Sequence, residues 1–179
     1  MVKTIRHIVL FLFVFCLQIN VLNAQQFSEY EVKGAFICNF AKFAEWPASS
    51  YTSDTSAIEI AIVGNDPFGD VIDRIAKNAG VGQRKVIVKR YNSPEDAKKS
   101  HIVFFGGLTE NSPIEILLRP LANKPVLTIS EVDGFCEHGG MINFPGTPIK
   151  YGFEINSKSV KSAGLAVSPK LLHLAVLVE

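Results

Sequence analysis

Acidic, thiol and imidazole side chains are concentrated in one segment, residues 131–140. It contains Glu131, Asp133, Cys136 and His138 among several glycines. A zinc site needs three or four converging ligands, usually in pairs at short fixed spacings such as C-x2-C or H-x3-H. Only Cys136 and His138 have a suggestive spacing, and no second cluster completes a set. We therefore expect a loop whose glycines adopt positive φ angles, and no metal centre.

General-base and nucleophilic chemistry is no better supported. The sequence has no G-x-S-x-G elbow. His101, His138 and His173 lie at a strand start, in a loop and in the last predicted helix, where surface or packed histidines are expected. Glu154 is the one acid that we single out, because it alternates with apolar neighbours in a predicted strand. It is either paired on a covered face or solvated at an edge, and we expect no catalytic residue.

The segment Gly64 to Gly69 connects a predicted strand to a predicted helix. Such loops bind phosphate at a helix N-terminus when they carry the Lys-Ser/Thr of a P-loop or a G-x-G-x-x-G pattern. Neither pattern is present, and Pro67 removes one backbone donor. A tight turn that caps a helix is the better interpretation, so no cofactor is expected.

The first 24 residues are typical of a secretory signal peptide. Lys3 and Arg6 precede the apolar run Ile8 to Leu17, and Ala24 supplies a small residue at the end. The run is shorter than the roughly 20 apolar residues that span a bilayer. The residue before Cys16 is not small, as a lipid anchor would require. We expect cleavage after Ala24 and a secreted, soluble protein.

The remaining residues, 25–179, suit one domain. They carry 16 basic and 17 acidic side chains, and this near neutrality argues against nucleic acid as a partner. Two cysteines remain, Cys38 and Cys136. In an oxidising compartment they form either a disulfide or two separate thiols, because spacing alone does not tell whether their Cα atoms are close enough to bridge.

Hydrophobic patterns predict strands that alternate with helices. A capping box at Ser28 and Glu31 starts a helix that Pro47 ends at Trp46. Its apolar face is predicted from the spacing of Val32, Phe36, Phe40 and Phe43. Strands are predicted over Ile58 to Val63, Val86 to Tyr91, Ile102 to Phe105 and Val126 to Ile129, with helices started by Asp66-Pro67, Ser93-Pro94 and Ser112-Pro113.

The last third changes pattern. Met141 to Phe144 and Tyr151 to Ile155 flank a proline- and glycine-rich turn, which predicts a hairpin. Asn156 is placed to cap a helix over residues 157–163, and Ser168 to cap a final helix, Pro169 to Leu177. The sequence thus predicts a single three-layer α/β domain, with a mostly parallel sheet, helices on both faces and a C-terminal antiparallel hairpin.

Three groups of segments resemble the YfiR-like family of periplasmic regulatory proteins, also described as YfiR/HmsC-like. The first is Val32 to Phe36 with Asn39 to Phe43 and Glu45 to Pro47, and the second is Ile62 to Gly69. The third comprises Gly139 to Ile142, Phe153 to Asn156, Ala163 to Leu165 and Ser168 to Ala175. They occur in a consistent order over nearly the whole chain after residue 24.

The resemblance implies a regulator that acts by binding. The best-known kind restrains an inner-membrane diguanylate cyclase through the periplasmic part of the enzyme, and an outer-membrane lipoprotein draws the regulator away. Others are similar to the input side of sensor kinases, and homodimers are common. The resemblance thus implies a non-enzymatic repressor in cyclic di-GMP signalling. The alternative hypothesis is a small-ligand-binding input protein for a sensor histidine kinase. An enzyme is the third hypothesis.

The resemblance also implies a partner-binding site in the C-terminal segment. Val160, Val167, Pro169 and Leu172 fall at positions that line a hydrophobic pocket in the family, and Glu154 falls at a polar contact position. Ser157 replaces an apolar residue there. One departure concerns cysteine pairs: Cys136 fits one such position, but its expected neighbour is Asn143.

Overall fold

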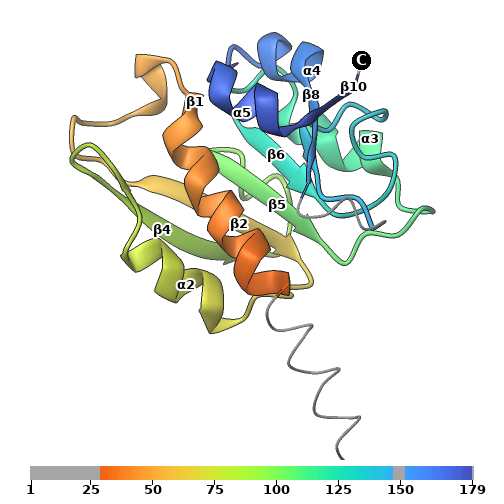
Figure 1. Cartoon of the computed structure of the whole chain (residues 1–179), viewed down its shortest axis with the longest axis horizontal. Helices are drawn as coiled ribbons and strands as arrows, with labels where there is room; N and C mark the ends of the chain where they lie inside the picture. The colour runs from red at the N-terminus through yellow and green to blue at the C-terminus, as the bar shows by residue number, and fades with distance from the viewer. Residues whose placement is uncertain (1–28, 147–151, 179) are drawn as a thin grey trace, which may run out of the picture.

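The fold is built around an eight-stranded sheet, described by a computed structural model over residues 29–146 and 152–178 (Figure 1). The predicted signal peptide and the predicted cap at Ser28 lie outside the described residues, as do residues 147–151 of the predicted hairpin. The strand order is β10-β8-β7-β6-β5-β2-β4-β3. The strands are β2 (Ile58–Gly64), β3 (Gly80–Val81), β4 (Arg84–Tyr91), β5 (Ile102–Gly106), β6 (Leu127–Ser130), β7 (Ile142–Asn143), β8 (Glu154–Asn156) and β10 (Val176–Val178).

Five neighbouring strands, β4, β2, β5, β6 and β7, run parallel, as the sequence predicts. The strand β5 is buried at every position because both faces of the sheet are covered. The strand β4 alternates: Val86 is buried, whereas Lys85, Ile87 and Lys89 are exposed. The predicted hairpin is also confirmed, because β7 and β8 pair antiparallel.

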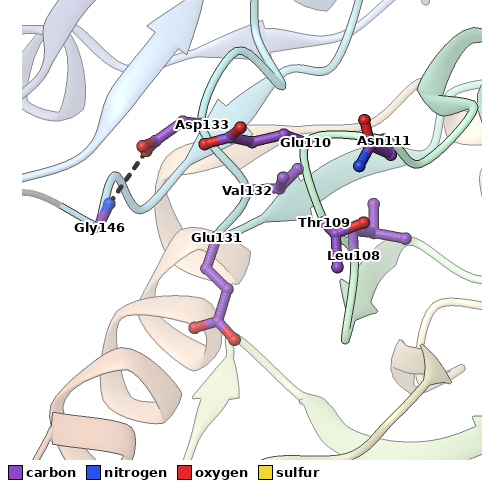
Figure 2. A pocket seen from close by; sticks show the side chains of 8 residues that line it. All are labelled: Leu108, Thr109, Glu110, Asn111, Glu131, Val132, Asp133 and Gly146. Atoms are coloured by element: carbon purple, nitrogen blue, oxygen red, sulfur yellow. Dashed lines mark hydrogen bonds between the residues drawn. The ribbon is translucent and has the colours of Figure 1, made fainter.

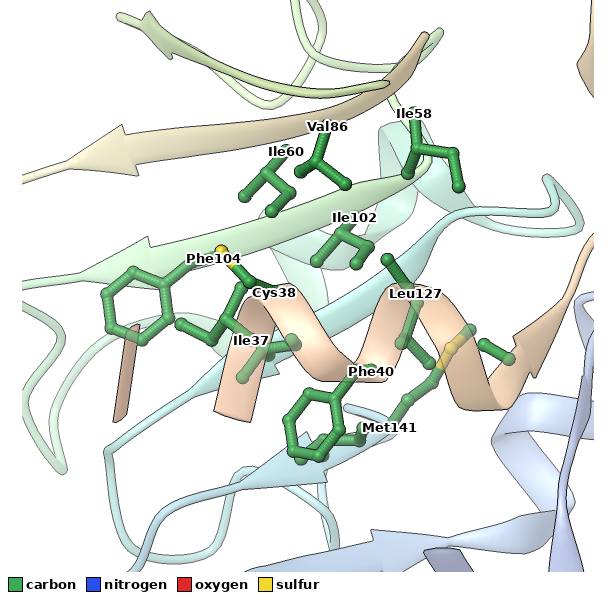
Figure 3. Packing of buried hydrophobic residues seen from close by; sticks show 14 of the residues in the cluster. Ile37, Cys38, Phe40, Ile58, Ile60, Val86, Ile102, Phe104, Leu127 and Met141 are labelled. Atoms are coloured by element: carbon green, nitrogen blue, oxygen red, sulfur yellow. The ribbon is translucent and has the colours of Figure 1, made fainter. Parts of the chain in front are cut away.

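The first helix, residues 29–43, covers one face of the sheet together with α2 (Asp70–Lys77), α4 (Ser157–Ser162) and α5 (Pro169–Leu174). Ile37, Cys38 and Phe40 pack from the helix against the strands (Figure 3). The buried side of this helix is centred on Ile37, Phe40 and Ala41, whereas the predicted residues Val32, Phe36 and Phe43 are only half-buried. The prediction is therefore displaced by about one position around the helix.

The opposite face has a smaller apolar core. It includes Val103 and Phe105 of β5, Leu121 after α3 (Ile114–Leu118), and Phe135 of the loop that follows β6. Two short 3-10 segments, η1 (Ala48–Ser50) and η2 (Arg119–Leu121), complete the helical elements. The helix predicted after Ser93-Pro94 is wrong: residues 93–99 form turns, which bury Ala97 against this face.

Both ends of the chain contain strands that the patterns did not predict. The first helix ends at residue 43, before the predicted Trp46, because β1 (Ala44–Glu45) pairs antiparallel with β9 (Ala166–Val167). The last helix ends at Leu174, and Val176–Val178 form β10, parallel to β8. At both points the chain pairs with a strand that lies far away or earlier in the sequence, so tertiary pairing overrides the local helical pattern.

Candidate functional site at the C-terminal edge of the sheet

The C-terminal unit, residues 154–178, folds as strand, helix, strand, helix, strand. Both predicted caps are present. The Asn156 side chain accepts a hydrogen bond from the Ser159 N–H (2.8 Å), and the Ser168 hydroxyl accepts one from the Leu171 N–H (3.4 Å). These caps satisfy backbone donors at the starts of α4 and α5 and fix where each helix begins.

This unit exposes apolar side chains at the edge of the sheet. Leu174 is 68% exposed, Leu177 57% and Val176 47%. Figure 1 shows the last strand beside α5, and β10 has no described strand on its outer side. Isolated exposed apolar residues are ordinary, but three within four residues on an open edge are typical of a contact surface. We call Leu174, Val176 and Leu177 the C-terminal edge.

The six residues expected to bind a partner do not form one patch. Val160 is 1% exposed and belongs to the core, while Val167 and Leu172 are half-buried and pack against it. Pro169 is the only exposed member, and Ser157 is half-buried. Val160 therefore offers no surface to a partner, and Pro169 is the first residue of α5, the helix that leads to the C-terminal edge.

Glu154, the sixth of these residues, points to the other face of the sheet. Its cross-strand neighbour is Asn143, whose amide donates to a Glu154 carboxylate oxygen (2.9 Å). Asn143 is fully buried, and its own side-chain oxygen has no hydrogen-bond partner among the described residues. The half-buried Glu154 is thus held by a buried amide, as the covered-face interpretation predicts, and it stabilises the β7–β8 pair.

The structure has Cys38 and Cys136 as buried free thiols. Cys38 packs in the core under the first helix, whereas Cys136 lies on the loop after β6, where the Asn156 amide donates to its carbonyl (2.9 Å). The disulfide alternative is therefore not what the structure shows. Burial raises the pKa of Cys38 to about 11 and that of Cys136 to about 12, the latter also through the Glu154 charge.

A second candidate region lies at the carboxyl ends of the parallel strands. An open depression of about 400 Å³ is lined by the loops after β5 and β6 (Figure 2). Glu110 and Asp133 face it, and Asp133 accepts a hydrogen bond from the Gly146 N–H (3.2 Å). Glu131 is turned to the first helix, where the Lys33 ammonium lies 2.8 Å away. Burial lowers the pKa of Lys33, but its bonds to Glu131 and Glu29 raise it overall.

Beside this depression lies the topological switch point between β2 and β5, where the order in which strands are added to the sheet reverses. Open α/β sheets usually bind a ligand at such a point. Here the backbone closes that point. The backbone after β2 approaches the end of β5 closely. A Cβ on Gly106 would lie 1.9 Å from the Asn65 carbonyl oxygen, and the Asn65 N–H donates to the Gly106 carbonyl (3.2 Å). A deep crevice for a small ligand is therefore filled by main chain. The turn expected here is confirmed, because Asp66 accepts hydrogen bonds from the N–H groups of Phe68 and Gly69. The cap is not: α2 begins only at Asp70, with Gly69 as its N-cap and no side-chain cap bond.

Over the described ranges, no group of three or more His, Cys, Asp or Glu side chains is arranged to hold a metal ion. The acidic loop after β6 is anchored by the buried Phe135, against whose ring a Cβ on Gly140 would lie 2.2 Å away. His138 is exposed and lies 3.3 Å from Glu115. In the same described part of the chain, no helix has the length and apolarity needed to cross a membrane.

Comparison with known proteins decides the family. The YfiR/HmsC-like family matches residues 30–176. The chain belongs to the YfiR/HmsC-like family. At the level of the family, this supports a regulatory protein of the periplasm that takes part in cyclic di-GMP signalling. Leu174 and Val176 of the C-terminal edge lie within the matched residues, and Leu177 follows them directly.

One solved structure is similar to this YfiR/HmsC-like chain. It is a conserved domain protein from Vibrio cholerae O1 biovar El Tor, with 12% sequence identity and a TM-score of 0.46. The match covers 68% of this chain and 55% of that chain.

The sequence patterns missed the residues that the structure exposes most clearly. The sequence predicts all three, Leu174, Val176 and Leu177, within one final helix, whereas the structure ends that helix at Leu174. One signal was available: residues 171–178 contain no Asp, Glu, Lys or Arg, which is unusual for an exposed segment of a YfiR/HmsC-like protein.

Proposed function

We propose that this protein is a periplasmic regulatory binding protein that holds an inner-membrane signalling enzyme, of the diguanylate cyclase type, through protein–protein contact. The observation that carries the proposal is the C-terminal edge, with three exposed apolar side chains in four residues. A partner that covers them removes apolar surface from water, at roughly 25 cal/mol per Å². Sequestration requires only a difference in affinity between partners and no chemistry.

The position of this surface in the fold supports the proposal. Leu171 and Val160 anchor α5 and α4 in the core, and β10 is hydrogen-bonded to β8, with the Val176 N–H donating to Phe153 (2.9 Å). The exposed side chains therefore stand on elements that are held on their inner side. A preformed surface binds at a lower entropic cost than a mobile segment does.

Capture from an envelope extract of the producing cells tests the proposal. Residues 25–179 serve as bait, beside a Leu174→Asp, Leu177→Asp variant and a matched Ile116→Asp variant. Ile116 is 58% exposed on α3, so the control makes the same apolar-to-acid change elsewhere. We expect the wild type and Ile116→Asp to retain a diguanylate cyclase, and the double variant to lose it. A wild type that retains no signalling enzyme would contradict the proposal, as would equal loss in the control.

The same experiment addresses the other partners that the family resemblance implies. A captured sensor kinase would replace the cyclase as the controlled enzyme. An outer-membrane lipoprotein that releases the cyclase from wild-type bait would identify the competing ligand. Size-exclusion chromatography with light scattering measures whether the protein is a homodimer, and a dimer that persists in the double variant would place that contact elsewhere.

A further inference from the structure

The surroundings of the C-terminal edge are positively charged. Lys158 and Lys161 on α4 and Lys170 on α5 are all exposed. None of the three takes part in an ion pair with a described residue. Residues 155–178 contain no aspartate or glutamate at all. The whole mature chain is nearly neutral, so this unit concentrates unpaired positive charge around exposed apolar side chains.

Two acidic residues are placed at this unit by strand pairing. Glu45 of β1 is the register partner of Ala166 in β9 and is exposed, on the small two-stranded sheet. Glu154 of β8 is the register partner of Val176, but its half-buried carboxylate accepts a hydrogen bond from Asn143 on the face of the sheet opposite to α4 and α5. Neither acid forms an ion pair with the three lysines, and Glu179 follows the unit in the sequence.

The backbone of β10 leaves one hydrogen-bonding side open. Val176 uses its N–H toward β8, where it donates to Phe153. Successive backbone groups of a strand point to opposite sides, so the N–H and C=O of Leu177 point away from β8, toward the outer side where no described strand lies. A segment in extended conformation can pair there by strand addition.

These observations indicate which kind of partner can bind at the C-terminal edge. A second copy would bring the same lysines together, and like charges in close contact oppose association. A segment with alternating acidic and apolar residues would pair with the open backbone, cover Leu174 and Leu177, and neutralise the lysines. We infer that the C-terminal edge binds an extended, acidic and apolar segment of the regulated partner, which lies against β10. This inference rests on the proposed function and adds the chemistry of the partner.

Fluorescence anisotropy with defined peptides tests this inference. The probe is a labelled octapeptide of alternating glutamate and valine, and its charge-reversed counterpart alternates lysine and valine. The proteins are wild type, a Lys161→Glu, Lys170→Glu variant and a matched Lys77→Glu, Lys99→Glu variant, in which the same charges change at exposed lysines of α2 and of the turn before β5. We expect the acidic peptide alone to bind, about tenfold more weakly to the first variant, with unchanged binding to the second and weakening by salt.

Equal binding of the two peptides, or equal loss in both variants, would overturn the inference. Binding to phosphatidylglycerol vesicles without binding to the acidic peptide would overturn it too, because the basic, apolar surface would then face a membrane. The capture experiment separates this result from the proposed function. If the cyclase is captured but the peptide does not bind, only the inferred chemistry fails; if the peptide binds but no signalling enzyme is captured, the proposed function fails while the surface stands.

Discussion

The two edges of the eight-stranded sheet are built differently. At the β4 edge, charged side chains form ion pairs within the molecule. The Arg90 guanidinium lies 3.0 Å from the Asp66 carboxylate and 2.6 Å from the Asp73 carboxylate, and Lys89 pairs with Glu59. The short strand β3 also covers the start of β4. At the β10 edge, exposed positions are apolar, and the nearby lysines are unpaired among the described residues.

The comparison shows which edge is protected and which is available. Charged side chains on an edge strand discourage pairing with another chain. Arg90 and Lys89 of the β4 edge form ion pairs within the molecule and so contribute to the stability of the fold, whereas the exposed Lys85 has no ion pair with a described residue. The β10 edge exposes apolar side chains, which are expected to contribute little to stability, and the proposed function assigns them to a contact with another molecule. The experiments below test this difference.

The largest effect is expected inside the C-terminal unit. Val160→Asp would place a carboxylate in the hydrophobic core, at a site that is 1% exposed, so we expect a loss of about 4 kcal/mol or more in the free energy of unfolding. Leu177→Asp, on the exposed side of the same unit, should cost less than about 1 kcal/mol. Urea denaturation measures both, and similar losses would mean that β10 is part of the core.

A smaller effect is expected near the β4 edge when the pH falls. Burial lowers the pKa of His101, although the Glu59 charge opposes this. The Nδ1 atom of His101 accepts a hydrogen bond from the Glu59 N–H (3.1 Å), which fits the neutral ring. Because the unfolded chain takes up the proton more readily, stability present above pH about 6.5 is lost as the pH falls below that value.

Urea denaturation between pH 7 and pH 5 measures this loss. The pKa of Glu59 is held low: burial raises it, but hydrogen bonds from Lys89, Ser100 and Tyr91 outweigh burial. Glu59 therefore stays ionised in this interval. We expect the decrease in wild type to be much smaller in His101→Gln. If both proteins lose stability in parallel, His101 is not the group responsible.

A third difference concerns single side chains on the two edges. Arg90→Ala removes a guanidinium that bridges two acids, and because Arg90 is partly exposed and screened by solvent, we expect a cost of about 1 kcal/mol. Leu177→Ser on the other edge should change stability by less than about 0.5 kcal/mol. The cost of Arg90→Ala should shrink in 1 M salt. A larger cost for Leu177→Ser would remove the contrast between the edges.

The smallest effect is expected in thiol labelling. Burial raises the pKa of Cys38 and Cys136, and neither thiol reaches solvent. Iodoacetamide at pH 8 should leave both unmodified in the folded protein and modify both in urea, as measured by mass spectrometry. Labelling of Cys136 before Cys38 would show that the loop under β7 and β8 opens more readily than the first helix does.

The sequence predicts the interior better than the boundaries. Strands such as Ile102–Gly106 are identified because burial on both faces leaves a continuous apolar run, and Asn156 and Ser168 are identified because a cap is a local signal. The strand Val176–Val178 is not identified from the sequence, because a short apolar run fits a helix or a strand. Only its pairing with β8 determines that it is a strand. The candidate site was missed for the same reason: exposure of Leu177 depends on which neighbours the fold supplies.

The packing of the first helix has a consequence for the order of folding. The centroid of the Phe40 ring lies 5.1 Å from that of the Phe153 ring, and Phe40 also stacks on Phe144. Phe153 follows Phe40 by about 110 positions in the chain. The first helix therefore has no partner for this part of its apolar face until most of the polypeptide has been made. Long-range closure of this kind slows folding. We expect chains that end before Phe144 to leave the helix uncovered and to need a chaperone.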